Sequence, residues 1–199
     1  THYSQFVPLL LDLWGQDFMH RGCLSFHYQN ACTEGDRVRA FVARPATDDA
    51  NCLRLWAEKS DGTPVLTGTA TTGPDYGASE LDQRMARLRP PGQLLILEDL
   101  EVGMRGGGRE EVSMGFDQNM GALYPFTLGQ KLKVITEPSA WYTREEGSQS
   151  PWKRPIIPWE MISVLAEYKH DVTNFPVKGP AVGLFADQEI KLFNGPLFV

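Results

Sequence analysis

The stretch EEGSQSPWKRPIIPWEM, residues 145–161, holds the side chains with the clearest potential for chemistry. It contains three prolines, two tryptophans and a Lys-Arg pair just before a short amphipathic segment. A lysine can carry protons when apolar burial lowers its pKa, and a serine hydroxyl can hold a water. Lys153 and Ser148 would have these roles if Trp152 and Trp159 enclosed the lysine. The same aromatic residues could instead line an apolar slot for a ligand.

These residues also have ordinary structural interpretations. Four large aromatic side chains can be core or interface residues with or without a ligand: Trp141, Tyr142, Trp152 and Trp159. The Lys153-Arg154 pair is either solvated or in contact with a ligand phosphate. The histidines are scattered and the cysteines lack C-x-x-C spacing, so the sequence predicts no metal site.

Composition and charge limit the partners. The chain has 199 residues, a hydrophobic fraction of 42% and a formal net charge of -6. This balance is typical of a soluble globular protein and argues against a nucleic-acid or anionic-membrane surface, since either partner would be repelled. No apolar run reaches the roughly 18 residues that a membrane span needs, and no signal peptide is evident. The expected location is therefore cytoplasmic.

The N-terminal part predicts a helix followed by antiparallel strands. Apolar residues recur with the i, i+3, i+4, i+7 spacing of a core-facing helix at Phe6, Leu9, Leu10 and Leu13. Four segments then alternate with the period of two that is typical of strands: CLSFHYQN, RVRAFVA, CLRLWAEK and PVLTGTAT. TEGD predicts a turn, and SDGT predicts a hairpin because Gly62 can take a positive φ. Residues 1–72 thus predict an α+β arrangement in which the sheet covers the helix.

The rest of the chain predicts a linker and a second, similar unit. Residues 73–92 are rich in proline and glycine, with a short helix expected at ASELDQRMARL. In residues 93–199, KLKVI predicts a strand, Thr136 a helix cap, and WEMISVLAEYKH a helix with the same apolar spacing as the first. KHDVTNFPVKGPAV predicts a loop that covers a pocket, and IKLFNGPLFV a strand that echoes FHYQNACTEGD. The chain therefore predicts two partial repeats, in a mature fragment or a truncated chain.

Residues 134–161, VITEPSAWYTREEGSQSPWKRPIIPWEM, resemble a segment of the MaoC-like dehydratase, or hydratase-2, family. In that family a V-T-E entry, a helix and an aromatic residue lead to a G-D-x-N-P-L-H loop and then to the main helix. Gly147 and Pro151 match the glycine and proline of the loop. The resemblance implies a hotdog fold, in which a curved antiparallel sheet wraps around a central helix, here as a double hotdog.

The resemblance places unusual residues at the catalytic positions of the loop. Ser148 stands at the family's Asp position and Lys153 at its His position, while Pro158 and Trp159 stand near its H-G before the helix. Three interpretations follow: a degenerate half whose working Asp and His lie in the other repeat or on a partner subunit, a rewired enzyme that uses Lys153, or a binding module. The residues expected to contact substrate are Tyr142, Glu145, Trp152, Pro158, Trp159 and Met161.

The function implied by the resemblance is hydration or dehydration of an enoyl thioester. One group must activate water and another must move a proton at the α-carbon, while an amide N–H near the helix start stabilises the oxyanion. The substrate carrier would be coenzyme A or a carrier protein, with no further cofactor, and the assembly a homodimer or a hotdog heteromer. The alternatives are a non-catalytic acyl-thioester-binding or scaffolding subunit, or a thioesterase in which Glu145 faces the thioester carbon.

Overall fold

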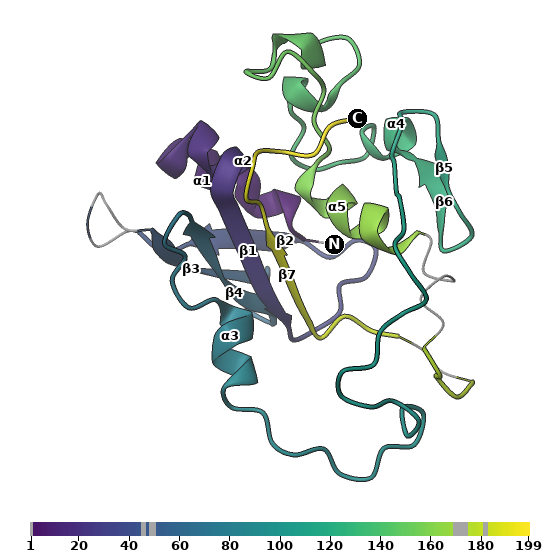
Figure 1. Ribbon diagram of the computed structural model, residues 1–199. Helices are drawn as coiled ribbons and strands as arrows, with labels where there is room; N and C mark the ends of the chain where they lie inside the picture. The colour runs from purple at the N-terminus through teal and green to yellow at the C-terminus, as the bar shows by residue number, and fades with distance from the viewer. Residues whose placement is uncertain (1, 45–46, 48–50, 169–174, 181–182) are drawn as a thin grey trace. The chain divides into compact units, whose positions relative to one another are not determined.

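The computed structural model describes residues 2–44, 47, 51–168, 175–180 and 183–199. It has α+β architecture, with one five-stranded and one two-stranded antiparallel sheet (Figure 1). The chain forms two compact units, the first made of Thr1–Leu88 and Phe185–Leu197, the second of Arg89–Leu184 and Phe198–Val199. The predicted α+β class is confirmed. The predicted repeat boundaries at residues 72 and 93 stay predictions, because a strand can pair outside the repeat to which its sequence belongs.

The first unit is built on the five-stranded sheet, in the order β2-β3-β4-β1-β7. Its strands are β1 (Gly22–Tyr28), β2 (Val38–Val42), β3 (Cys52–Lys59), β4 (Pro64–Thr72) and β7 (Asp187–Lys191). Period-two alternation predicts β1 to β4, and these strands are confirmed, whereas β7 overlaps the predicted strand IKLFNGPLFV, residues 190–199, only at Ile190 and Lys191. Strand β7 lies far along the chain yet pairs with β1, with Phe26 opposite Gln188.

Helices lie on both faces of this sheet. They are η1 (Ser4–Phe6), α1 (Val7–Trp14), α2 (Gln16–Arg21) and α3 (Glu80–Met85). The predicted N-terminal helix is confirmed, but half of its predicted core face is wrong: Phe6 and Leu10 are buried, whereas Leu9 and Leu13 are 39% and 42% exposed. Tyr3 and Val7 complete the buried face instead. The helix is apolar on several sides, so its sequence admits two faces with the same spacing.

Phe26 is the centre of the first core. Its ring lies 4.8 Å from the ring of Tyr3 and 5.0 Å from that of Phe6, so η1 packs on this face of the sheet. Opposite Phe26 on β4 stands Gly68. A Cβ at Gly68 would lie 2.5 Å from Phe26 Cδ1 and 2.4 Å from the Ser25 carbonyl oxygen. Phe26 can occupy this place because residue 68 has no side chain.

Helix α3 covers the opposite face and is held there by two buried hydroxyls. The Glu80 N–H donates to Thr69 Oγ1 over 2.8 Å, and the Leu81 N–H donates to Ser25 Oγ over 2.9 Å. Ser79 and Asp82 form a reciprocal capping box at the same end. The amides that a helix start leaves free are therefore satisfied by the sheet itself.

The two predicted turns are confirmed. Gly62 has φ +87° between β3 and β4. In the turn between β1 and β2, Asp36 Oδ2 accepts from the Thr33 N–H over 2.8 Å and lies 2.8 Å from Lys59 Nζ. The hydrogen bond to Lys59, followed by that from Thr33, lowers the pKa of Asp36 to about 2.

The second unit contains short helices and one longer helix. Its elements are β5 (Asn119–Met120), β6 (Tyr124–Thr127), α4 (Leu128–Lys131), η2 (Ala140–Tyr142), η3 (Gly147–Gln149) and α5 (Trp159–Glu167). The predicted helix α5 is confirmed, and Met161, Val164 and Leu165 on its predicted face join the buried core. Its expected end at 169–170 and part of the expected covering loop, residues 169–174 and 181–182, lie outside the described residues.

Two predictions in this unit are wrong. KLKVI, residues 131–135, forms no strand, because Thr127 and Gln130 form a capping box that starts α4 directly before it. Thr136 caps no helix in the described structure. The next turn, η2, begins instead after Ser139, whose hydroxyl accepts from the Trp141 N–H over 3.2 Å.

Across the residues described, none of the helices has both the length and the apolar character to cross a membrane.

We expect the substitution Gly68→Ala to lower the free energy of unfolding of the first unit by about 1–3 kcal/mol. The new methyl group would overlap the Phe26 ring and force the central core to shift. Urea unfolding followed by far-UV circular dichroism measures the change. Gly92→Ala is the control, since no atom lies within 4 Å of a Cβ there. An unchanged midpoint for Gly68→Ala would contradict the packing described.

We expect Asp36→Asn to lower the thermal midpoint at pH 7 by a few degrees, and this difference to shrink as the pH falls. The folded pKa of Asp36, about 2, is below its unfolded value, so its contribution is present above about pH 4 and is lost as the pH falls through the folded pKa. Thermal unfolding over a pH series tests this. Glu34→Gln, at an exposed position in the same turn, is the control; a pH-independent difference would be the contrary result.

Candidate functional site

The predicted loop is held together by its own backbone and by one buried serine. Ser150 Oγ donates to the Arg154 carbonyl over 2.7 Å, and the Lys153 N–H donates to the Ser150 carbonyl over 3.0 Å. Gly147 is buried, and a Cβ there would lie 2.7 Å from Pro155 atoms. The turn between residues 150 and 154 is therefore closed on itself and packed against Gly147.

The two residues at the predicted acid/base positions are on the outside of this loop. Ser148 and Lys153 are both exposed, and Lys153 has the left-handed φ of 58°. The apolar burial by Trp152 and Trp159 that the proton-carrier hypothesis required is absent, so that part of the expectation is wrong. Their correspondence to the family's Asp and His positions stays a prediction.

Most of the predicted substrate-contacting residues are core residues. Trp159 and Met161 have no exposed surface, Tyr142 is 2% exposed, and Pro158 is buried directly before α5. Burial, followed by the nearby carboxylates of Glu137 and Glu160, raises the pKa of Tyr142. The structural interpretation of Tyr142 and Trp159 as core aromatics is confirmed. These side chains stabilise the second unit.

The remaining two predicted residues are at the surface. Trp152 is partly buried, with its ring 5.6 Å from that of Trp141 in an edge-to-face arrangement. Glu145 is exposed and lines a pocket of about 590 Å³. Of the sequence-predicted residues, Glu145 is therefore the one that borders this pocket.

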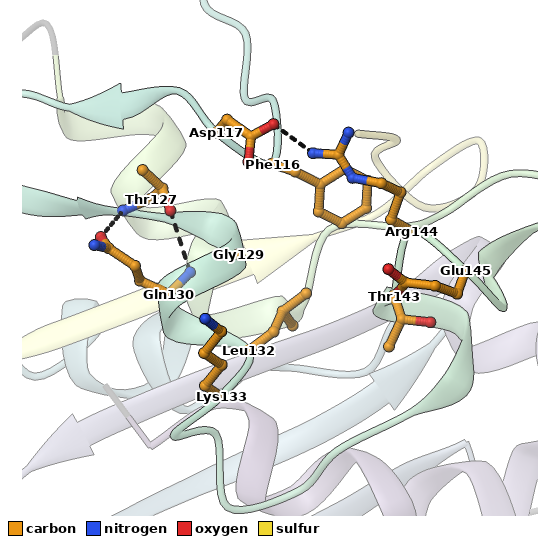
Figure 2. Close-up of a pocket in the computed structure, with 10 residues that line it drawn as sticks. All are labelled: Phe116, Asp117, Thr127, Gly129, Gln130, Leu132, Lys133, Thr143, Arg144 and Glu145. Atoms are coloured by element: carbon orange, nitrogen blue, oxygen red, sulfur yellow. Dashed lines mark hydrogen bonds and ion pairs between the residues drawn. The ribbon is translucent and has the colours of Figure 1, made fainter.

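Figure 2 shows the pocket, which lies entirely within the second unit. Its walls come from α4 with its cap and from the segments around Phe116 and Thr143. The lining residues are Phe116, Asp117, Thr127, Gly129, Gln130, Leu132, Lys133, Thr143, Arg144 and Glu145. Sequence reasoning missed nine of these ten, because they come from three separate segments. The T-x-x-Q capping pattern at Thr127 was the one local signal for this wall.

Arg144 has a fixed position in the pocket. Its guanidinium lies 2.5 Å from Asp117 Oδ2 and 4.8 Å above the Phe116 ring (Figure 2). Both partners of the ion pair are more than half exposed, so the pair contributes only about 0–1 kcal/mol to stability. Its effect on the pocket is that the positive charge of Arg144 is already balanced before a ligand arrives.

A second cation, Lys131 of α4, is paired with Glu160 of α5. Lys131 Nζ lies 2.6 Å from Glu160 Oε1, and the Glu160 side chain is 7% exposed. Removing one partner from a buried ion pair leaves an uncompensated charge, which is costly. This pair therefore holds α4, and with it one pocket wall, against α5.

Of the two exposed carboxylates in the pocket, Asp117 is paired with Arg144, and Glu145 has no ion pair with another described residue. The ten lining residues include no histidine, cysteine or serine. Both threonine hydroxyls have local partners: Thr127 Oγ1 accepts from the Gln130 N–H, and Thr143 Oγ1 accepts from the Glu146 N–H. Glu145 is left as the possible base. Among the described residues, no group of three or more His, Cys, Asp or Glu side chains is arranged to hold a metal ion.

Comparisons with protein-family models, with curated proteins and with solved structures give no match to this chain.

We expect Gly147→Ala to destabilise the second unit by about 1–3 kcal/mol, because the added methyl group would overlap Pro155 and open the turn between residues 150 and 154. Thermal unfolding followed by tryptophan fluorescence is the appropriate measurement, since Trp141, Trp152 and Trp159 lie in this unit. Gly92→Ala in the same unit again provides the control. Equal midpoints for the two variants would show that the loop tolerates a side chain at residue 147.

Proposed function

We propose that this chain is part of a MaoC-like double hotdog protein that hydrates or dehydrates acyl thioesters of coenzyme A or of a carrier protein. Within it, residues 145–161 are a structural loop. The α+β class and the five-stranded antiparallel sheet are compatible with a hotdog. The hotdog fold, the thioester substrate and the structural role of the loop are the parts that we propose beyond this compatibility.

One observation carries the proposal. The loop keeps the glycine and proline that the resemblance matches, Gly147 and Pro151, and Gly147 is packed against Pro155. At the positions that the resemblance assigns to proton transfer, it has side chains that face solvent. A loop that keeps its shape without placing acid/base groups in an enclosed site supports the degenerate-half interpretation. The water activation and the α-proton transfer then come from the counterpart loop of the other repeat or from a partner subunit.

Glu145 favours a second candidate function, thioester hydrolysis. A carboxylate at the wall of an open pocket can activate a water that attacks the thioester carbonyl, which releases the thiol and a carboxylic acid. Arg144, fixed by Asp117 and Phe116, stands next to Glu145 in the chain and borders the same pocket (Figure 2). This candidate requires only groups of the second unit.

We expect the protein, purified in the assembly that contains the counterpart loop or the partner subunit, to consume crotonyl-coenzyme A with loss of the enoyl absorbance. In this assembly Ser148→Ala and Lys153→Ala should keep turnover within about twofold of the unsubstituted protein. Both side chains are exposed and their removal leaves the backbone of the loop intact. A drop of about a hundredfold for Lys153→Ala would overturn the structural role of the loop.

Two further measurements separate the functions. Release of free thiol that disappears in Glu145→Gln would replace hydration by hydrolysis. Binding of crotonyl-coenzyme A by calorimetry, with neither loss of the enoyl absorbance nor thiol release, would overturn the enzymatic proposal in favour of an acyl-binding subunit. Absence of binding and of turnover would overturn the acyl-thioester class altogether.

A further inference from the structure

The outer face of the first sheet carries one row of side chains that crosses all five strands. The register pairs Phe41 with Trp56, Trp56 with Thr67, Thr67 with His27, and His27 with Asp187. Directly paired residues project from the same face of a sheet. This row is on the face opposite Phe26, because successive residues of β1 alternate between faces.

The row contains two aromatic walls with a small residue between them. The Phe41 and Trp56 rings are stacked, with centroids 5.1 Å apart and an interplanar angle of 8°. On the other side of Trp56 comes Thr67, and then His27. Trp56 and His27 are thus two strand spacings apart, about 9.6 Å. A planar ring stacked on Trp56 needs about 3.5 Å, because carbon atoms make their best contacts at that distance, so the two strand spacings leave room for a ring above Thr67.

The second wall is also fixed. His27 Nδ1 lies 3.1 Å from Asp187 Oδ1, and the same oxygen lies 2.5 Å from Arg84 Nε of α3. The side chains of His27 and Asp187 are both 24% exposed. The neighbouring row, with Thr69 and Ser25, is covered by the start of α3. The uncovered part of the row is therefore at Trp56 and Thr67, because α3 also reaches the His27 end through Arg84.

A pocket of about 540 Å³ opens over β3 and β4, beside Trp56 and Thr67, and neither His27 nor Asp187 lines it. Its lining residues, all in the first unit, are Ala43, Arg54, Trp56, Ala57, Glu58, Pro64, Leu66 and Thr67. Arg54 and Glu58 stand two residues on either side of Trp56. Glu58 is paired with Arg39 over 3.0 Å, whereas Arg54 forms no ion pair with any other described residue. Arg54 gives the pocket its positive charge.

We propose that this pocket binds a purine nucleotide, with the base stacked on Trp56 above Thr67 and the phosphate near Arg54. Trp56 is an aromatic platform with Arg54 nearby on the same strand, and an aromatic platform with a nearby cation is the combination that binds a base and a phosphate. The ligand is either a free nucleotide or the nucleotide part of coenzyme A. The site lies on a different unit from the Figure 2 pocket and goes beyond the proposed function.

The test is calorimetric titration of the protein with AMP, with an expected Kd of about 1 mM or tighter. Trp56→Ala is expected to weaken binding by about tenfold or more. Thr67→Leu keeps Trp56 but fills the space above the strand, and is expected to abolish binding. Thr67→Val keeps the size of the side chain and is expected to bind normally. Trp152→Ala, a partly buried tryptophan of the second unit, is the control and should also bind normally.

Further ligands separate base from phosphate and identify the source. Arg54→Gln is expected to weaken AMP severalfold and to leave adenosine unchanged. If coenzyme A binds, Thr67→Leu abolishes this binding and pantetheine does not bind at this site, then the natural ligand is the nucleotide part of coenzyme A. If AMP binds and coenzyme A does not, the natural ligand is a free nucleotide. Crotonyl-pantetheine turnover in Thr67→Leu reports on the proposed function separately.

Three results would overturn the proposal. The first is absence of AMP binding to the unsubstituted protein, and the second is equal AMP affinity in Thr67→Leu and Thr67→Val. The third is a concentration-dependent dimer that dissociates in Thr67→Leu and does not bind AMP, which would identify this face as an interface between two copies of the chain. Far-UV circular dichroism of each variant confirms that its fold is retained.

Discussion

The close approach of Phe26 to Gly68 is the constraint on which the first unit depends. Because residue 68 lacks a side chain, the Phe26 ring can lie over the neighbouring strand, and Tyr3 and Phe6 pack on that ring. This contact fixes which side of the N-terminal helix faces the sheet. It also fixes the register between β1 and β4, since a shift by one residue would turn every side chain of the strand to the other face.

The same alternation that builds the core also builds the opposite face. With Phe26 turned inward, Ser25 and His27 must turn outward, where Ser25 accepts a hydrogen bond from α3 and His27 meets Asp187. Stability and potential binding are thus properties of alternate residues of a single strand. In the second unit, stability and potential binding belong to different segments. Its buried aromatic side chains and the Lys131–Glu160 pair stabilise an irregular chain, and the pocket lies at the surface of that chain.

Local patterns in the sequence predicted the elements better than they predicted the site. Strands β1 to β4 and helix α5 follow from alternation and apolar spacing, which depend on neighbouring residues only. The face of the first helix was half wrong, because VPLLLDLW is apolar on several sides and only Phe26 selects between them. Glu145 alone was anticipated in the Figure 2 pocket, since the pocket depends on contacts such as Arg144 with Asp117 that join distant segments. The exposure of Lys153 follows from a left-handed turn that its residue type does not favour.

The pairing of β7 with β1 has a consequence for how the chain reaches this structure. His27 and its partner on β7 are 160 residues apart in the sequence. During synthesis at about 5–20 residues per second, β1 therefore waits on the order of 10 s for its second neighbour. Throughout that time one side of β1 has unpaired backbone groups, which another strand could occupy. The first unit can assemble most of its sheet early, but β1 gains its second neighbour only after residues 89–184 of the second unit have been made.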